Sequence, residues 1–247
     1  MNNLILEKKA GEFRNANSIG ANDAIRLKSL LSQLNVLTVY RPLSLNFGGM
    51  AIKINNGNDV KRFILVNSNR TIGNQHFTIG HELYHLYFQK EFASKICNIG
   101  VYDSKDKEEC NADIFASYLL LPESGIKMLI PDNELGKNKI LLNTILKIEH
   151  FFSCSRTALL YRLKQLNFID SALYDTYKEN VKRSALQFGY SIDLYESGNH
   201  NLVVGDYGTI ARNLFEKEII SESNYFSLLL DLGINVDEIE KLGNEDD

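Results

Sequence analysis

Apolar and polar positions recur along the chain with two different periods, and the change of period separates predicted strands from predicted helices. Residues 36–40, 49–54 and 62–66 are short runs rich in β-branched residues, and the Asn- and Gly-containing residues 55–58 are typical of a hairpin turn. We therefore expect a small antiparallel sheet. Helical periodicity marks most of the other segments, namely residues 23–34, 75–88, 108–121, 123–130, 139–152, 156–166, 171–188, 209–217 and 221–232.

The two ends of the chain differ in composition from the rest. Residues 1–22 are polar and are expected to form a flexible lead, and the acidic residues 244–247 are expected to be disordered. Glycine-containing turns near residue 195 indicate a further boundary between parts of the chain. We predict three parts: a lead at 1–22, a main domain at 23–194 and a C-terminal helical appendage at 195–247. The appendage would complete the core, cover a cleft or recognise a partner.

The helix predicted at residues 75–88 contains the pentad HExxH, formed by His81, Glu82 and His85. Two histidines four residues apart share one helix face, with Cβ atoms about 5–6 Å apart, so both imidazoles can bind one metal ion. Glu82 can then take a proton from water that the metal polarises. The pentad is the signature of a zinc-dependent hydrolase, with His81 and His85 as ligands and Glu82 as the catalytic base.

The third ligand has to come from elsewhere in the chain. One class of zinc protease continues the motif with a glycine and a third histidine, but Phe88 and Glu91 occupy those positions here. The next predicted helix offers Glu109 and Asp113, again four residues apart. If the two helices pack together, Glu109 can bind the metal while Asp113 accepts a hydrogen bond from the other ring nitrogen of one histidine. A fourth position then stays open for water, as catalytic zinc requires; Mn²⁺ or Fe²⁺ also suits these donors.

Beyond the pentad, residues 109–122 read ECNADIFASYLLLP, and residues 153–163 form a short polar turn followed by a helix that ends in Arg-Leu. These segments resemble the ImmA/IrrE-type metallopeptidases, whose pattern is HExxH followed by ExxA(N/D)xFAxxLLxP. The resemblance covers roughly residues 25–168. Gly80 replaces the usual alanine and Tyr84 a frequent glycine, but no ligand is lost. The resemblance assigns His81, His85 and Glu109 to the metal and Glu82 to catalysis.

Together, the predicted elements and the resemblance imply an α+β fold in which the small antiparallel sheet flanks a helical zincin-like core. Members of this family cleave helix-turn-helix repressors. The resemblance thus implies a zinc-dependent endopeptidase that hydrolyses a separate helix-turn-helix repressor and so switches on mobile-element or stress-response genes. A metal-dependent sensor that binds a repressor without proteolysis is the alternative. A new N-terminus on the partner would distinguish cleavage from binding.

Composition limits the other function classes. The net charge of −4 and the pI of about 5.8 argue against nucleic-acid binding as the main task. Residues 147–166 have the outline of a helix-turn-helix, although a packing role fits the acidic chain better, and a DNA-binding regulator would show steeply salt-dependent affinity. The three cysteines form no CxxC pair, and the chain has neither a signal-peptide pattern nor an apolar run long enough to span a membrane. We expect a cytoplasmic protein.

Two further residues have both a catalytic and a structural interpretation. His150 would either stabilise a tetrahedral intermediate or pack in the core, and an isolated histidine favours the second. Tyr84 would either lend its hydroxyl to a developing oxyanion or pack beside its helix, and packing is again favoured.

Overall fold

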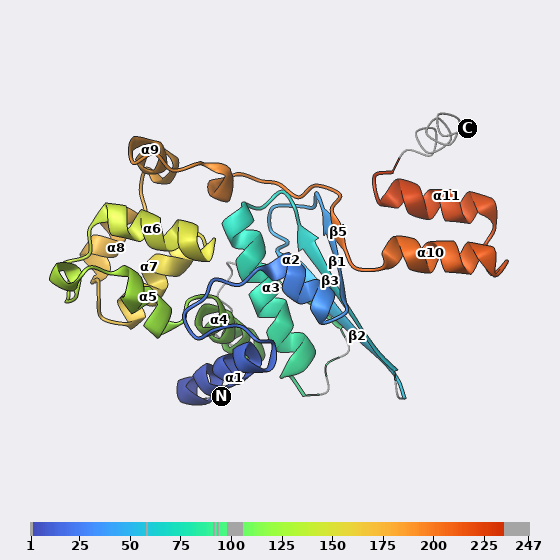
Figure 1. Cartoon of the computed structure of the whole chain (residues 1–247), viewed down its shortest axis with the longest axis horizontal. Coiled ribbons are helices and arrows are strands. Elements are labelled where there is room, and N and C mark those ends of the chain that lie inside the picture. The colour runs from blue at the N-terminus through green and yellow to red at the C-terminus, as the bar shows by residue number, and fades with distance from the viewer. Residues whose placement is uncertain (1, 58, 91, 93, 98–105, 235–247) are drawn as a thin grey trace.

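The computed structural model describes residues 2–57, 59–90, 92, 94–97 and 106–234 (Figure 1). The fold is α+β, as the sequence predicts. The layers follow one another in the order sheet, α3, α4 and α1, and the helices from α5 to α8 lie beyond α4 (Figure 1). Glu91 and the acidic residues 244–247, for which the sequence gives expectations, lie outside the described residues.

The sheet has the strand order β4-β2-β3-β1-β5. Its strands are β1 (Val36–Arg41), β2 (Gly49–Asn56), β3 (Asp59–Asn67), β4 (Ser94–Cys97) and β5 (Val203–Val204). The predicted hairpin is the antiparallel pair β2–β3, whereas β1 runs parallel to β3. The sheet is therefore mixed, and the prediction of an antiparallel sheet is wrong for this pair.

The parallel pair results from the path of residues 42–48, which cross the end of β3. The buried side chain of Asn67 holds this crossing: its Nδ2 donates to the carbonyl oxygens of Ser44 and Phe47, both at 2.7 Å, and its Oδ1 accepts from the Leu43 N–H. Because the loop passes over β3, β1 and β2 lie on opposite sides of that strand. A strand run alone does not indicate which neighbour it will pair with.

The helices mostly match the segments with helical periodicity. They are α1 (Asn3–Ala16), α2 (Leu27–Gln33), α3 (Ile72–Tyr87), α4 (Lys107–Leu120), α5 (Glu123–Leu129), α6 (Leu142–Phe152), α7 (Arg156–Gln165), α8 (Ser171–Tyr177), α9 (Val181–Gln187), α10 (Tyr207–Glu216) and α11 (Glu222–Asp231). Two short 3₁₀ turns are η1 (Asp132–Glu134) and η2 (Asp193–Tyr195). The single helix expected at 171–188 is divided, because Asn180 adopts a left-handed conformation with φ 52° that interrupts it.

The N-terminal segment is not a flexible lead. It forms α1, whose Leu6, Ala10 and Phe13 are buried against the core, and the ring of Phe13 packs edge-on against Phe115 of α4. Arg14 adds a hydrogen bond of 2.6 Å to the Leu119 carbonyl oxygen. The prediction for residues 1–22 is thus wrong, because an apolar stripe at helical spacing lies among its charged residues. The boundaries proposed at residues 22 and 194 remain predictions.

Close packing of α3 against α4 brings the HExxH pentad and the segment that carries Glu109 together. A Cβ built on Gly80 would lie 3.3 Å from the Ala116 Cβ and 3.2 Å from Leu120 Cδ1, so glycine permits a short separation of the two helices here. Leu83 and Phe115, from the same two helices, are fully buried in the core. The helix that carries the pentad therefore packs closely against the helix that carries Glu109.

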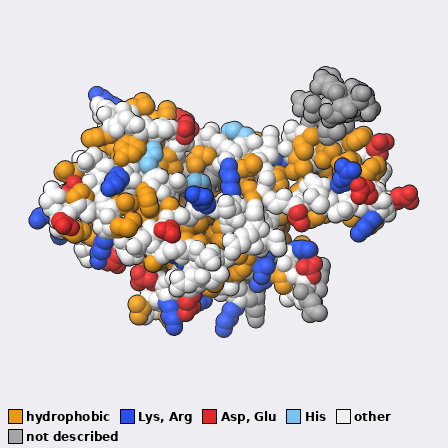
Figure 2. Space-filling view, in the orientation of Figure 1, with side chains coloured by type: hydrophobic (Ala, Val, Ile, Leu, Met, Phe, Trp, Pro, Cys, Tyr) orange, Lys and Arg blue, Asp and Glu red, His pale blue; other side chains and the backbone are white. Residues whose placement is uncertain are grey.

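The last two helices, α10 and α11, form a hairpin that projects away from α3 and α4 (Figure 1). Apolar side chains gather over this hairpin in Figure 2. Two large apolar residues of this segment, Ile219 and Leu230, are 64% and 60% exposed. Crossing a lipid bilayer requires a longer and more apolar helix than any in the described part of the chain.

Candidate metal centre

Helix α3 places the two histidines of the pentad on its buried face. Thr71 caps the helix by accepting from the Asn74 N–H, and every residue from Thr78 to Leu86 is buried. His81 and His85 are 2% and 0% exposed, with ring centroids 4.9 Å apart. Their Nε2 atoms point at one another across 3.0 Å. The i, i+4 spacing thus produces two adjacent imidazole nitrogens, as the sequence predicts.

Helix α4 brings a carboxylate to the same point. Asp106 caps this helix through the N–H groups of Glu108 and Glu109, and Pro122 follows its end. The Glu109 Oε2 atom lies 3.2 Å from His81 Nε2, and Oε1 lies 3.4 Å from His85 Nε2. One candidate ligand atom from each of these three residues lies within 4.8 Å of the others.

The other nitrogen of each imidazole has its own partner. His81 Nδ1 lies 2.8 Å from Asp113 Oδ1, and His85 Nδ1 contacts Gln89 Oε1. Because both partners accept hydrogen bonds, Nδ1 carries the proton and Nε2 keeps a lone pair in each neutral ring. Two lone pairs and a carboxylate then converge on one point. A divalent cation fits this donor set, and two imidazoles with one carboxylate are a ligand set that catalytic zinc uses.

Glu82, the residue predicted to be the base, is fully buried on the side of α3 that faces the sheet. A Cβ built on Gly49 of β2 would lie 3.2 Å from Glu82 Oε1 and only 2.4 Å from Thr78 Cγ2. Glycine at this position therefore makes room for the carboxylate between α3 and the sheet. Gly49 also pairs with Cys97 of β4, so Glu82 lies near the β2–β4 end of the sheet.

Sequence reasoning missed several residues around the histidines. Gln89 lies four positions after His85, so the same periodicity that relates the histidines also indicates it. Phe92 stacks on the His85 ring at 5.4 Å, but it follows the end of α3, where no periodicity applies. Gly49 belongs to a strand distant in sequence and is recognisable only from the packing of α3 on the sheet.

Tyr84 packs between the helices. Its side chain is fully buried, and its hydroxyl donates a 2.8 Å hydrogen bond to Glu108 Oε2. Burial and the Glu108 carboxylate both raise the pKa of the Tyr84 hydroxyl. The structural interpretation of this residue therefore accounts for its contacts.

His150 belongs to another polar cluster, formed with α7 and η2. Its Nε2 lies 3.2 Å from the Tyr195 hydroxyl, which donates to Glu149 Oε2 at 2.7 Å, and its ring stacks on Tyr190. Glu149 also forms a buried ion pair with Arg156. Burial raises the pKa of Glu149, and the adjacent Arg156 opposes this shift. These contacts give His150 a structural role.

The basic residues of segment 147–166 are largely engaged inside the protein. Arg156 and Arg162 are each 3% exposed, and Arg162 Nε donates to the Leu121 carbonyl oxygen while its guanidinium lies over the Tyr118 ring. On the face drawn in Figure 2, lysine and arginine side chains are interspersed with acidic ones. Packing, rather than phosphate contact, explains the two buried arginines.

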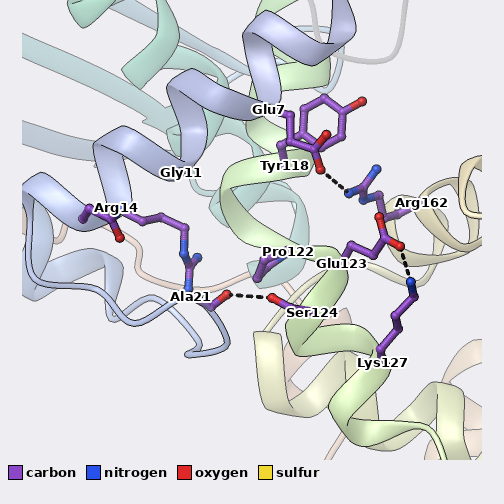
Figure 3. A pocket seen from close by; sticks show the side chains of 11 residues that line it. Glu7, Gly11, Arg14, Ala21, Tyr118, Pro122, Glu123, Ser124, Lys127 and Arg162 are labelled. Carbon is purple, nitrogen blue, oxygen red and sulfur yellow. Dashed lines mark hydrogen bonds and ion pairs between the residues drawn. The ribbon is translucent and has the colours of Figure 1, made fainter.

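Arg162 also borders a cavity of about 500 Å³ between α1, α4 and α5 (Figure 3). Two ion pairs lie within it: Arg162 Nη2 is 3.9 Å from Glu7 Oε1, and Lys127 contacts Glu123 (Figure 3). None of His81, His85, Glu109 and Asp113 lines this cavity. It is therefore separate from the candidate metal centre.

Comparison with known proteins agrees with the geometry. The family model described as Peptidase_M78, the IrrE N-terminal-like domain, matches residues 32–164, which are more than half of the chain. This span contains β1 to β3, both histidines of the pentad and Glu109. No curated protein matches the chain significantly. The chain therefore belongs to the M78 peptidase family with an IrrE N-terminal-like domain.

Proposed function

We propose that this protein is a zinc-dependent endopeptidase that hydrolyses a peptide bond within a protein substrate. The observation that carries the proposal is the convergence of His81 Nε2, His85 Nε2 and the Glu109 carboxylate, with the buried Glu82 next to the first histidine. Membership of a peptidase family supports the reaction class. The same donors also accept Mn²⁺ or Fe²⁺, and zinc is proposed because catalytic sites of this composition use it.

Each residue of the centre has a distinct task in this proposal. His81, His85 and Glu109 would hold the metal, and a bound divalent cation supplies Lewis acidity toward a carbonyl oxygen and toward water. Asp113 orients His81 through the 2.8 Å contact to its Nδ1. Glu82 accepts the proton of the attacking water and transfers it to the amine nitrogen that leaves.

The sheet edge offers a way to bind the substrate backbone. Strand β4 stands at one edge of the described sheet, and Gly49 pairs with its Cys97 while lying next to Glu82. An extended peptide that adds to this edge forms main-chain hydrogen bonds whatever its sequence. Side-chain pockets would then select the bond that is cleaved.

For the substrate, we propose a separate helix-turn-helix transcriptional repressor in the cytoplasm, whose cleavage switches on mobile-element or stress-response genes. The resemblance to ImmA/IrrE-type enzymes in residues 81–85 and 109–122 supports this choice, and a peptidase of any kind requires a peptide or protein substrate. Metal binding that alters a repressor contact without hydrolysis is the competing possibility.

Co-expression with candidate helix-turn-helix repressors, followed by intact-mass measurement of each repressor, tests the proposal. Three forms of the protein are compared: wild type, Glu82→Gln and the control Glu108→Gln. The control makes the same chemical change in α4, and its amide oxygen can still accept the hydrogen bond from Tyr84. We expect wild type and the control to produce two fragments of defined mass, and Glu82→Gln to leave the repressor intact.

The outcomes separate the alternatives. Fragments that also appear with Glu82→Gln would exclude the proposed role of this carboxylate. A repressor that remains intact but leaves its operator DNA only in the presence of metal-loaded protein would favour a sensor that does not cleave.

A further inference from the structure

A second cavity, of about 440 Å³, is lined by none of His81, His85 and Glu109 but reaches the candidate metal centre at Asp113. Helices α3, α4 and α7 provide its walls, and Tyr174 of α8 adds to them. Asp113, whose carboxylate contacts His81, belongs to its lining. The cavity therefore shares a wall with the group that positions a candidate metal ligand.

Helical periodicity relates the lining of this cavity to the candidate metal ligands. On α3 the lining residues Asn74 and Phe77 precede His81 by seven and four positions, so the three side chains share one stripe of the helix. On α4 the lining residue Ser117 is four positions after Asp113, which is itself four positions after Glu109. Both stripes run from the cavity to the point where His81 and Glu109 meet.

The lining is mainly apolar with a few polar atoms. Phe77, Ile114, Ala158 and the ring of Tyr161 provide apolar surface from three helices. The Ser117 hydroxyl is buried and has no hydrogen-bond partner among the described residues, so a polar atom of an occupant could bond to it. A concave, mostly apolar site with few polar groups is typical of a pocket that binds an apolar ligand group.

We infer that this cavity is the specificity pocket of the enzyme and receives a large apolar side chain, such as Leu, Met, Phe or Tyr, from a substrate residue beside the cleaved bond. The inference rests on the proposed peptidase function. Backbone pairing at a sheet edge is tolerant of sequence, so an adjacent pocket of this chemistry would determine which bonds are cut. A small substrate side chain would leave the apolar part of the lining uncovered. A charged side chain would lose hydration where it met Phe77, Ile114 and Ala158.

Ala158 is the position that best tests this assignment. It is half-buried on α7 and lines the cavity opposite α3 and α4, so Ala158→Leu would fill part of the space. Thr157 also lines the cavity but is exposed. Thr157→Phe would therefore add a large side chain to the cavity wall without disturbing the core. Ala172→Leu on α8 is the matched control, because Ala172 is exposed and is not part of the lining.

The first readout is cleavage of a peptide library with every residue type at each position, with the cut sites identified by mass spectrometry. We expect wild type and Ala172→Leu to enrich large apolar residues at one position beside the cut by about tenfold or more. Ala158→Leu and Thr157→Phe should lose most of this enrichment. Cleavage without an apolar preference in wild type, or an unchanged preference in both pocket variants, would overturn the inference.

The second readout does not depend on turnover. Zinc-loaded proteins are titrated by calorimetry with acetohydroxamic acid and with 3-phenylpropionohydroxamic acid, which share a chelating group and differ in the apolar arm. We expect the phenyl compound to bind wild type about tenfold more tightly and to lose this advantage in the pocket variants. Equal affinities of wild type for the two hydroxamates would contradict the assignment of this cavity as an apolar specificity pocket. Absence of library cleavage, with the hydroxamate difference intact, would overturn the peptidase proposal instead.

Discussion

Replacement of Asp113 tests how the protein prepares His81 to bind a metal. The Asp113 Oδ1 atom lies 2.8 Å from His81 Nδ1, and the imidazole is almost completely buried. This contact keeps the proton on Nδ1 and the lone pair on Nε2, which faces Glu109. Asp113→Asn keeps an acceptor oxygen but removes the charge, and Asp113→Ala removes both.

The size of the effect follows from this geometry. Loss of a group that holds a metal-binding histidine typically weakens metal affinity about 10–100-fold, which corresponds to about 1.4–2.7 kcal/mol. A hydrogen bond to a charged acceptor is about twice as strong as one to a neutral acceptor. We therefore expect Asp113→Asn near the lower end of this range and Asp113→Ala near the upper end.

Competition between the protein and a chelator of known zinc affinity gives the dissociation constant of each variant. Glu108→Gln is the control, because it removes one negative charge from the adjacent turn of α4 without contacting either histidine. Its zinc affinity should stay close to that of wild type. Unchanged affinity in Asp113→Ala, or an equal loss in the control, would refute the view that Asp113 acts through His81.

Three other predictions concern the structure around the centre. Gly49→Ala should lower stability by about 1–3 kcal/mol in chemical denaturation, because the new methyl group would lie 2.4 Å from Thr78 Cγ2; unchanged stability would contradict this close packing. Arg156→Met should cost about 3–5 kcal/mol in the same assay, because it leaves the buried Glu149 without its ion-pair partner and, among the described residues, with only the hydrogen bond from Tyr195; a neutral effect would mean that Glu149 is protonated. Burial lowers the pKa of His76 below 6.5, so its contribution to stability is complete above that pH and declines as the pH falls. His76→Gln should therefore reduce the pH dependence of the denaturation midpoint between about pH 7.5 and about pH 5.5. An unchanged pH dependence would contradict this assignment.

Much of the centre is predictable from the sequence because it depends on local periodicity. His81 and His85 are fixed by one helix, and Glu109 and Asp113 by another, so the only long-range assumption is that the two helices pack together. The pairing of α3 with α4 supplies that contact. Gln89, four residues after His85, follows from the same periodicity.

The missed features depend on contacts between distant segments. The two-residue strand β5 is too short to show a period, and the parallel pairing of β1 is decided by the loop that Asn67 holds. Helix α1 is different, because Leu6, Ala10 and Phe13 already lie at helical spacing within a charged segment. Its apolar face is predictable from this spacing, although the overall polar composition of residues 1–22 suggests a flexible segment; this face packs against α4.

Zinc stoichiometry, measured by equilibrium titration of the purified protein, tests the candidate centre most directly. We predict one zinc ion per chain in wild type and in Glu82→Gln, and loss of tight binding in His85→Ala and Glu109→Ala. That result would show that the two histidines and Glu109 hold the metal while Glu82 remains available as a base. Tight binding that survives both ligand substitutions, or is lost in Glu82→Gln, would contradict the assignment.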